Sequence, residues 1–197
     1  MHPVIEAFLS SDLFGKIIFI ALFLLSMMSW ALFLQKISIC RYITKEGTRL
    51  LGLSSISGSS FHQHHPFASL YAAYQRSEQE GLSLDRLLSC AQAQERKHLE
   101  KGLYLLPTIV SLAPFLGLLG TVWGILLTFH ELQHGASAQT NTAVMSGLAM
   151  ALGATVVGLF VAIPALVSYN YLRAQIRHFC IDMESFSGLL LAKAEKP

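Results

Sequence analysis

The sequence predicts an all-α, polytopic membrane protein with three transmembrane helices that are extended by cytoplasmic helices. Hydrophobic residues make up 53% of its 197 residues and charged residues only 13%, whereas soluble domains carry about 25% charged residues. The 14 basic and 12 acidic residues all lie outside three stretches, 17–35, 102–130 and 132–172. A bilayer core about 30 Å thick is crossed by roughly 20 residues of helix. Each stretch is therefore long enough for one crossing, and the third leaves room for a polar loop at 134–141.

The first stretch could instead be a secretory signal peptide, which needs a basic leading region and a small-residue cleavage site. Glu6, Asp12 and a single lysine, Lys16, come before the apolar run. The residues from Trp30 to Lys36 that end it contain no A-x-A pattern. We therefore expect this segment to be retained as a transmembrane helix.

The distribution of basic residues predicts the orientation in the membrane. All Lys and Arg residues except Lys16 lie in 36–101 or from Arg173 onward, and none lies in 130–141. Basic residues remain on the cytoplasmic side during insertion, so the N-terminus is expected outside and the C-terminus inside. The predicted order is external segment 1–13, transmembrane helix 14–35, cytoplasmic helical segment 36–101, transmembrane helix 102–129, external loop 130–141, transmembrane helix 142–172 and cytoplasmic tail 173–197.

The segment between the first two spans is predicted to contain two helices after a flexible link. Gly and Ser dominate 52–60, a composition typical of such links. Pro66 fits the first turn of a helix, Gly81 is expected to break it, and Ser83 is expected to begin the next. The charges crowded at 95–101 predict a solvated helix that runs on into the second span.

Nothing in the sequence indicates an enzyme, a metalloprotein or a nucleic-acid-binding protein. There is no H-E-x-x-H motif, no phosphate-binding P-loop and no Asp or His pair in the spans. The net charge of +2 is too small to suggest nucleic acid. Histidines within His62–His65 could bind a metal, but a His-rich patch in a linker is more often adventitious. We therefore predict no metal and no cofactor.

The three cysteines do not suggest a disulfide framework. Cys40, Cys90 and Cys180 all fall on the predicted cytoplasmic side, where thiols stay reduced. Their odd number and scattered spacing also exclude a C-x-x-C metal site.

Small residues follow one face of the second and third spans at steps of three and four. Between membrane helices, close backbone approach through small residues replaces the hydrophobic drive of water-soluble cores. The two faces could form only a helical hairpin, but with a bulky, lipid-like first span they favour an oligomer. The predicted helix-packing residues are Gly117, Gly120, Gly124, Gly147, Ala151, Gly158 and Ala162.

Two threonines, Thr121 and Thr155, lie within these faces. Each hydroxyl could bond to the backbone of its own helix, as is common for membrane Ser and Thr. The alternative is a polar lining for a narrow conduit. Pro114 and Pro164 are expected to kink the two helices, and Pro107 to loosen the start of the second span.

The predicted spans contain no Asp or Glu residue, and their only Lys or Arg residue is Lys16, near the start of the first span. Proton pathways through membranes generally need a titratable group inside the bilayer. If this chain conducts protons, another polypeptide must supply the carboxylate.

The second and third spans closely resemble the signatures of the TolQ/ExbB branch of the MotA/TolQ/ExbB proton-channel family. The second-span run is Leu112–Ile125, LAPFLGLLGTVWGI, and the third-span run is Gly147–Ala165, followed by Tyr169-Asn170. Ser29-Trp30-Ala31 and the lead-in from Glu95 to Leu105 also fit. Because the two long runs occur in order and with matching topology, the resemblance is specific.

This resemblance implies a homo-oligomer of five subunits in the inner membrane of a bacterium, with the external loop in the periplasm. The ring would surround the single spans of a TolR/ExbD-like dimer, whose membrane aspartate takes up and releases the proton. Proton flow would then energise a TolA- or TonB-like protein that reaches the outer membrane. The family's pore-lining threonines correspond to Thr121 and Thr155.

The sequence departs from the family at one position. A glutamate usually stands three residues after the glycine that matches Gly147, and here that residue is Met150. A direct carboxylate relay through this subunit is therefore not expected. A flagellar MotA-type stator fits less well, because that branch has four spans. A non-conducting scaffold is the other alternative. The sequence does not separate the Tol system from the Ton system, because their channel subunits share these motifs.

Overall fold

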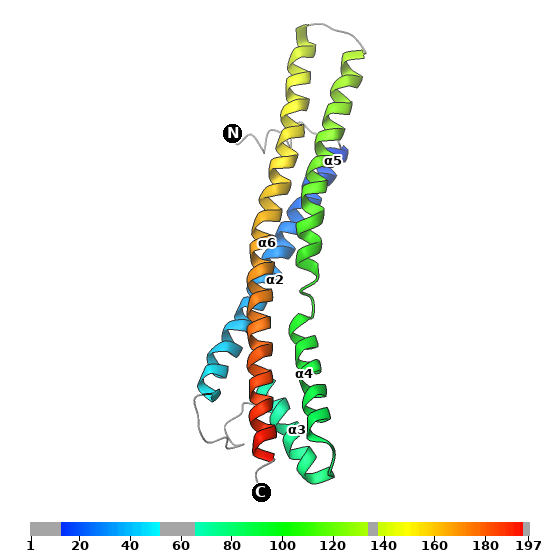
Figure 1. Ribbon diagram of the computed structural model, residues 1–197. Coiled ribbons are helices and arrows are strands. Elements are labelled where there is room, and N and C mark those ends of the chain that lie inside the picture. The colour runs from blue at the N-terminus through cyan, green and yellow to red at the C-terminus, as the bar shows by residue number, and fades with distance from the viewer. Residues whose placement is uncertain (1–12, 52–65, 134–137, 195–197) are drawn as a thin grey trace. The chain divides into compact units, whose positions relative to one another are not determined.

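The computed structural model describes residues 13–51, 66–133 and 138–194, and within these ranges the chain is helical with no strand (Figure 1). This confirms the predicted all-α class. Three stretches are long and apolar enough to cross a membrane, Leu13–Ile39, Leu84–His130 and Gly147–Ala194, as the sequence predicts. The helices are α2 (Leu13–Leu51), α3 (Pro66–Glu80), α4 (Leu84–Glu100), α5 (Leu105–Gln133) and α6 (Ala138–Ala194).

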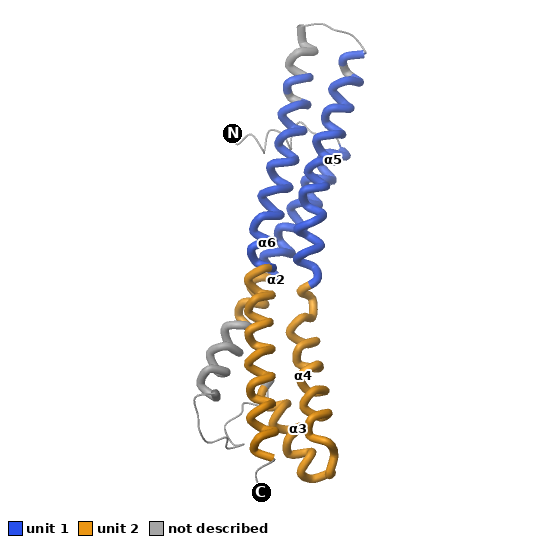
Figure 2. The backbone as a smooth tube through the Cα atoms, in the orientation of Figure 1, with its two compact units in different colours: residues 1–32, 104–169 blue, residues 33–103, 170–197 orange. Residues whose placement is uncertain are grey.

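The chain divides into two compact units (Figure 2). Unit 1 comprises Met1–Leu32 and Tyr104–Tyr169, and unit 2 comprises Phe33–Leu103 and Asn170–Pro197. Helices α2 and α6 contribute residues to both.

Unit 1 has a core of aliphatic and small side chains and an apolar exterior. Large side chains that stay exposed include Phe115 at 68%, Phe129 at 61% and Phe160 at 76%. Such a surface would be unfavourable in water but suits helices that face lipid or other apolar helices. The core cluster is Ile18 and Leu22 of α2, Ile109 and Ala113 of α5, and Val161, Ala162 and Ala165 of α6.

Unit 2 is organised around an aromatic core. Phe67 of α3 is fully buried, with its ring centroid 5.5 Å from that of Phe179 and 4.9 Å from that of Phe186 in α6. Helices α3 and α4 pack against each other. The amide Nε2 of Gln92 in α4 donates a hydrogen bond to the carbonyl oxygen of Met183 in α6 at 3.5 Å. These contacts join three helices in one core.

The predicted start and end of α3 are confirmed. The helix begins at Pro66 and ends at Glu80. Gly81 follows with φ of +66°, a left-handed conformation that glycine adopts without steric cost. Ser83 is the N-cap residue of α4.

The predicted continuous helix into the second span is wrong. Helix α4 ends at Glu100, and a turn at 101–104 separates it from α5. Gly102 adopts a φ of +78° there, and the Lys36 ammonium of α2 donates to the carbonyl oxygen of Leu99 at 3.0 Å. A lysine at this point satisfies one of the orphan carbonyls at the end of a helix.

Helix α6 is continuous for 57 residues and includes residues 173–194 of the segment predicted as the cytoplasmic tail. Pro164 lies inside α6, and Pro114 lies inside α5. The helices remain unbroken at both prolines, and the kinks stay a prediction.

Candidate functional site

Glycines of α5 bring its backbone directly against α6 in unit 1. A Cβ on Gly117 would lie 3.0 Å from the carbonyl oxygen of Ala154. A Cβ on Gly120 would lie 2.5 Å from the Cβ of Ala154, and one on Gly124 would lie 2.9 Å from the Cβ of Ala151. Real Cβ atoms essentially never approach closer than 3.0 Å, so the contacts at Gly120 and Gly124 depend on glycine, and the contact at Gly117 would be tighter than nine in ten real Cβ contacts.

Glycines of α6 make the reciprocal approach. A Cβ on Gly158 would lie 2.6 Å from the carbonyl oxygen of Ala113 and 3.2 Å from the Cα of Gly117. Gly147 meets the methyl group of Thr128, and Ala162 lies in the core cluster of unit 1. The small-residue faces of α5 and α6 therefore pack against each other within one chain, and they need no second copy for this.

Thr155 lies at the centre of this interface. Its Oγ1 donates a hydrogen bond to the carbonyl oxygen of Gly117 at 3.2 Å. The hydroxyl thus bonds to the neighbouring helix and not to its own, contrary to the simpler sequence expectation. Gly117 makes this possible because it has no side chain to hold the two backbones apart.

Thr121 lies on α5 and is half-buried. Its Oγ1 donates to the carbonyl oxygen of Leu118, one turn earlier in the same helix, at 2.7 Å. Among the described residues, no hydrogen bond joins Thr121 to Thr155. Each threonine instead uses its hydroxyl proton on a backbone carbonyl.

Met150, at the position where the resemblance implies a glutamate, is buried in unit 1. Its exposed fraction is 6%, and it clusters with Phe19 and Ala154. A carboxylate among these apolar groups would carry a large desolvation cost. The apolar side chain is therefore consistent with its surroundings.

Trp123 is a feature of unit 1 that the sequence analysis did not single out. Its ring centroid lies 4.3 Å from that of Phe14 in α2. Its indole Nε1 is buried without a hydrogen-bond partner in the described part of the chain. A buried indole usually has a hydrogen-bond partner. The only signal that the sequence offered for Trp123 is its place in an apolar run.

No metal site is present among the described residues, in which no three His, Cys, Asp or Glu side chains come together. The His62–His65 cluster lies outside the described residues. Cys90 is a free, exposed thiol, and Cys180 is a free, half-buried one.

Comparison with known proteins gives one family and several relatives. The family model described as the MotA/TolQ/ExbB proton channel family matches residues 62–185. The biopolymer transport protein ExbB of Aquifex aeolicus is 48% identical over 98 residues, which cover 50% of this chain and 66% of that protein. The Tol-Pal system protein TolQ of Haemophilus influenzae is 28% identical over 92% of this chain and 89% of its own length.

A third relative, the putative biopolymer transport protein ExbB-like 2 of Helicobacter pylori, is 55% identical over 74 residues. That match covers 38% of this chain and 49% of the relative. The match thus spans about half of the Helicobacter protein and just under two thirds of the Aquifex protein, but most of the Haemophilus protein.

Proposed function

The chain belongs to the MotA/TolQ/ExbB proton channel family, and from this premise we propose that it is the channel-forming subunit of an inner-membrane motor driven by the proton-motive force. It is a multi-pass membrane protein with three apolar helical spans. In the proposal its N-terminus is periplasmic and its C-terminus cytoplasmic. The motor would energise a TolA- or TonB-like protein for outer-membrane maintenance or transport.

The observation that carries this proposal is the arrangement of the Thr155 hydroxyl. A hydroxyl has one proton to donate and two lone pairs with which to accept. Because the proton of Thr155 is donated to Gly117, the oxygen retains its acceptor capacity. The Thr121 hydroxyl donates its proton to the carbonyl oxygen of Leu118, so its oxygen also retains its acceptor capacity.

Acceptor oxygens in an apolar span favour a partner that donates a hydrogen bond. A protonated carboxylic acid and a water molecule are both such donors, whereas a carboxylate accepts only. In the proposal, Thr121 and Thr155 stabilise the protonated form of an aspartate on a TolR/ExbD-like single-span partner. The aspartate would release its proton when it moves away from them.

In the proposal the acid comes from such a partner, because the predicted spans 14–35, 102–129 and 142–172 contain no Asp or Glu residue. Met150, which is buried against Phe19, has no acidic group and cannot supply the carboxylate. The ring of five subunits belongs to the same proposal. The apolar outer faces of α5 and α6 are available for contacts between copies and with lipid.

The proposal is tested by purification in mild detergent, identification of the co-purifying proteins, and measurement of proton flux in vesicles. We expect a single-span protein with a membrane aspartate to co-purify, and the complex to conduct protons. Thr155→Val should assemble but lose flux. Thr108→Val is a matched control, because the Thr108 hydroxyl, in the first turn of α5, donates to the carbonyl oxygen of Tyr104, the residue that precedes the helix. Absence of the acidic partner from the native complex would contradict the proposal.

A non-conducting scaffold is the second candidate. It is favoured by the fact that both threonine protons and both small-residue faces are engaged within one chain. This candidate predicts that Thr155→Val assembles and still supports outer-membrane work.

A further inference from the structure

Three amphipathic aromatic residues lie at one end of unit 1, and we propose that they anchor the chain in one headgroup layer of the bilayer. They are Trp30 of α2, Tyr104 directly before α5, and Tyr169 of α6, and they form the aromatic belt. The hydrocarbon core extends from this belt to the level of Lys16, near the start of α2. The proposal requires that the chain span a membrane, but it does not depend on proton conduction.

The charge-free stretches alone do not determine where the bilayer lies along the helices. The predicted spans 102–129 and 142–172 are about 42 and 47 Å long at 1.5 Å per residue, whereas the hydrocarbon core is about 30 Å thick. The predicted span 14–35 is about 33 Å long and fits the core. Because these helices pack together in unit 1, a common tilt that shortened the longer two would make the first too short. Part of α5 and of α6 therefore lies outside the core.

The contact between α2 and α5 places Trp30 close to the depth of Tyr104. The two helices run in opposite directions (Figure 1), and the ring centroids of Phe14 and Trp123 lie 4.3 Å apart. Continued along both helices, this register sets Trp30 opposite about residue 107. That position is about one helical turn, or 5 Å, from Tyr104.

The contact between α5 and α6 places Tyr169 at the same depth. A Cβ on Gly158 would lie 2.6 Å from the carbonyl oxygen of Ala113, so the antiparallel register sets Tyr169 opposite about residue 102, within one turn of Tyr104. Trp30 is 53% exposed and Tyr104 is 69% exposed. Amphipathic rings of this kind are enriched at the level of the lipid headgroups.

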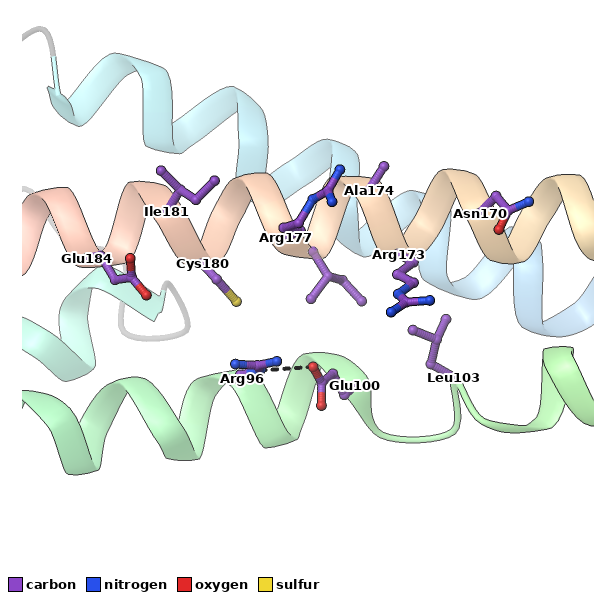
Figure 3. Close-up of a pocket in the computed structure, with 11 residues that line it drawn as sticks. Arg96, Glu100, Leu103, Asn170, Arg173, Ala174, Arg177, Cys180, Ile181 and Glu184 are labelled. Atoms are coloured by element: carbon purple, nitrogen blue, oxygen red, sulfur yellow. Dashed lines mark hydrogen bonds and ion pairs between the residues drawn. The ribbon is translucent and has the colours of Figure 1, made fainter.

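Polar side chains begin directly beyond the aromatic belt. Asn170 follows Tyr169 in the sequence, and Glu100 precedes Tyr104 by four residues. In unit 2, Asn170 and Glu100 line a groove of about 600 Å³, in which the Nε of Arg96 lies 3.0 Å from Oε1 of Glu100 (Figure 3). Ionised groups are costly in hydrocarbon. The core therefore ends at the belt.

Lys16 limits the core at its other end. In the register of α2 and α5 it lies opposite about residue 121, roughly 25 Å from Tyr104. At that depth its ammonium can extend to the second headgroup layer. If the core instead reached the end of α5 at Gln133, Lys16 would lie about 18 Å inside it, beyond the midplane, where a charge is costly. The ends of α5 and α6 therefore project beyond the bilayer.

The test measures the depth of single tryptophans in the whole protein, reconstituted in phosphatidylcholine vesicles. Bromine atoms on the lipid, placed near the headgroup or near the end of the acyl chain, quench the fluorescence. The chain has two tryptophans, so Trp123→Phe leaves Trp30 as the only reporter. We expect bromines near the headgroup to quench Trp30 at least about twofold more strongly than deep bromines.

Two further reporters use a chain with both tryptophans replaced by phenylalanine. Phe115→Trp is the matched control, because Phe115 is 68% exposed and about 16 Å from Tyr104, so deep bromines should quench it more strongly. Phe129→Trp, at a side chain that is 61% exposed and about 37 Å from Tyr104, should be quenched weakly by both bromine positions.

A further variant covers the case in which replacing Trp123 prevents folding. Trp30→Phe in the otherwise unchanged chain should lower the quenching by bromines near the headgroup, and unchanged quenching would contradict the belt. Stronger quenching of Trp30 by deep bromines would also overturn the proposal. Strong deep quenching in Phe129→Trp would show that the core extends to the end of α5, and headgroup-level quenching in Phe115→Trp would contradict the placement of the midplane.

Discussion

The Thr155 hydroxyl of α6 donates a hydrogen bond to the carbonyl oxygen of Gly117 in α5 at 3.2 Å. Thr155 Cα would also lie 3.0 Å from a Cβ on Gly117. The same close approach therefore creates the helix contact and directs the hydroxyl. The helix packing and the candidate proton chemistry therefore depend on the same two residues. Variants have to be chosen so that an effect on packing can be distinguished from an effect on proton flux.

Thr155→Val should abolish proton flux with only a small loss of stability. Valine has nearly the same shape but no hydroxyl, and hydrogen bonds between membrane helices contribute about 0.6 kcal/mol on average. Thr155→Ser keeps the hydroxyl and should retain part of the flux. The measurements are proton flux in vesicles and oligomer size in detergent. Equal flux in the valine and serine variants would reject the assignment of Thr155.

Gly158→Ala should destabilise unit 1 by about 1–3 kcal/mol, the range for overpacking a tight contact. The added methyl group would lie 2.6 Å from the backbone oxygen of Ala113, which cannot move as a side chain can. The matched control is Gly188→Ala in the same helix, where a Cβ meets nothing within 4 Å. Thermal unfolding in detergent should separate the two variants. The glycine contact would be refuted if both variants melted alike.

Phe67→Ala should destabilise the α3–α6 core of unit 2 by about 3–5 kcal/mol, the usual range for a buried phenylalanine. Phe67 is fully buried between Phe179 and Phe186. Gln75→Ala, at an exposed position of the same helix, is the control. Amide hydrogen exchange should speed up in α3 for the first variant only. Unchanged exchange in Phe67→Ala would show that the aromatic contacts do not stabilise this core.

The Cys180 thiol should react more slowly with a maleimide in the folded protein than in the denatured chain. Burial raises the pKa of Cys180, while the nearby Arg96 acts in the opposite direction and Glu100 and Glu184 act with burial. Since the thiolate is the nucleophile, a raised pKa means that folding moves the half-maximal rate to higher pH. Arg96→Gln should move it higher still.

The measurement uses a chain with Cys40 and Cys90 replaced by serine, with labelling followed from pH 7 to 10. A half-maximal rate at lower pH in the folded state would contradict the predicted direction. A shift to lower pH in Arg96→Gln would contradict the role given to Arg96.

The all-α class and the number of membrane-spanning helices follow from the sequence, because charged residues are excluded from the length of helix that crosses a bilayer. The helix break at Gly81 can also be predicted from the sequence, because this glycine stands between two helical patterns. The helix break at Gly102 cannot be predicted in this way. The same charged run, 95–101, is compatible with a continuous helix, and only the left-handed Gly102 and the Lys36 contact to Leu99 decide against one.

The sequence by itself determined which faces of α5 and α6 carry small residues, because a spacing of three and four residues places side chains on one face of a helix. The tertiary structure decided that these faces pack on each other, that Thr155 bonds to Gly117, and that Met150 meets Phe19. It also decided that Arg96 and Arg173, which lie far apart in the sequence, line one groove. Periodicity specifies the direction in which a side chain leaves its own helix, whereas the group that it meets depends on contacts between distant segments.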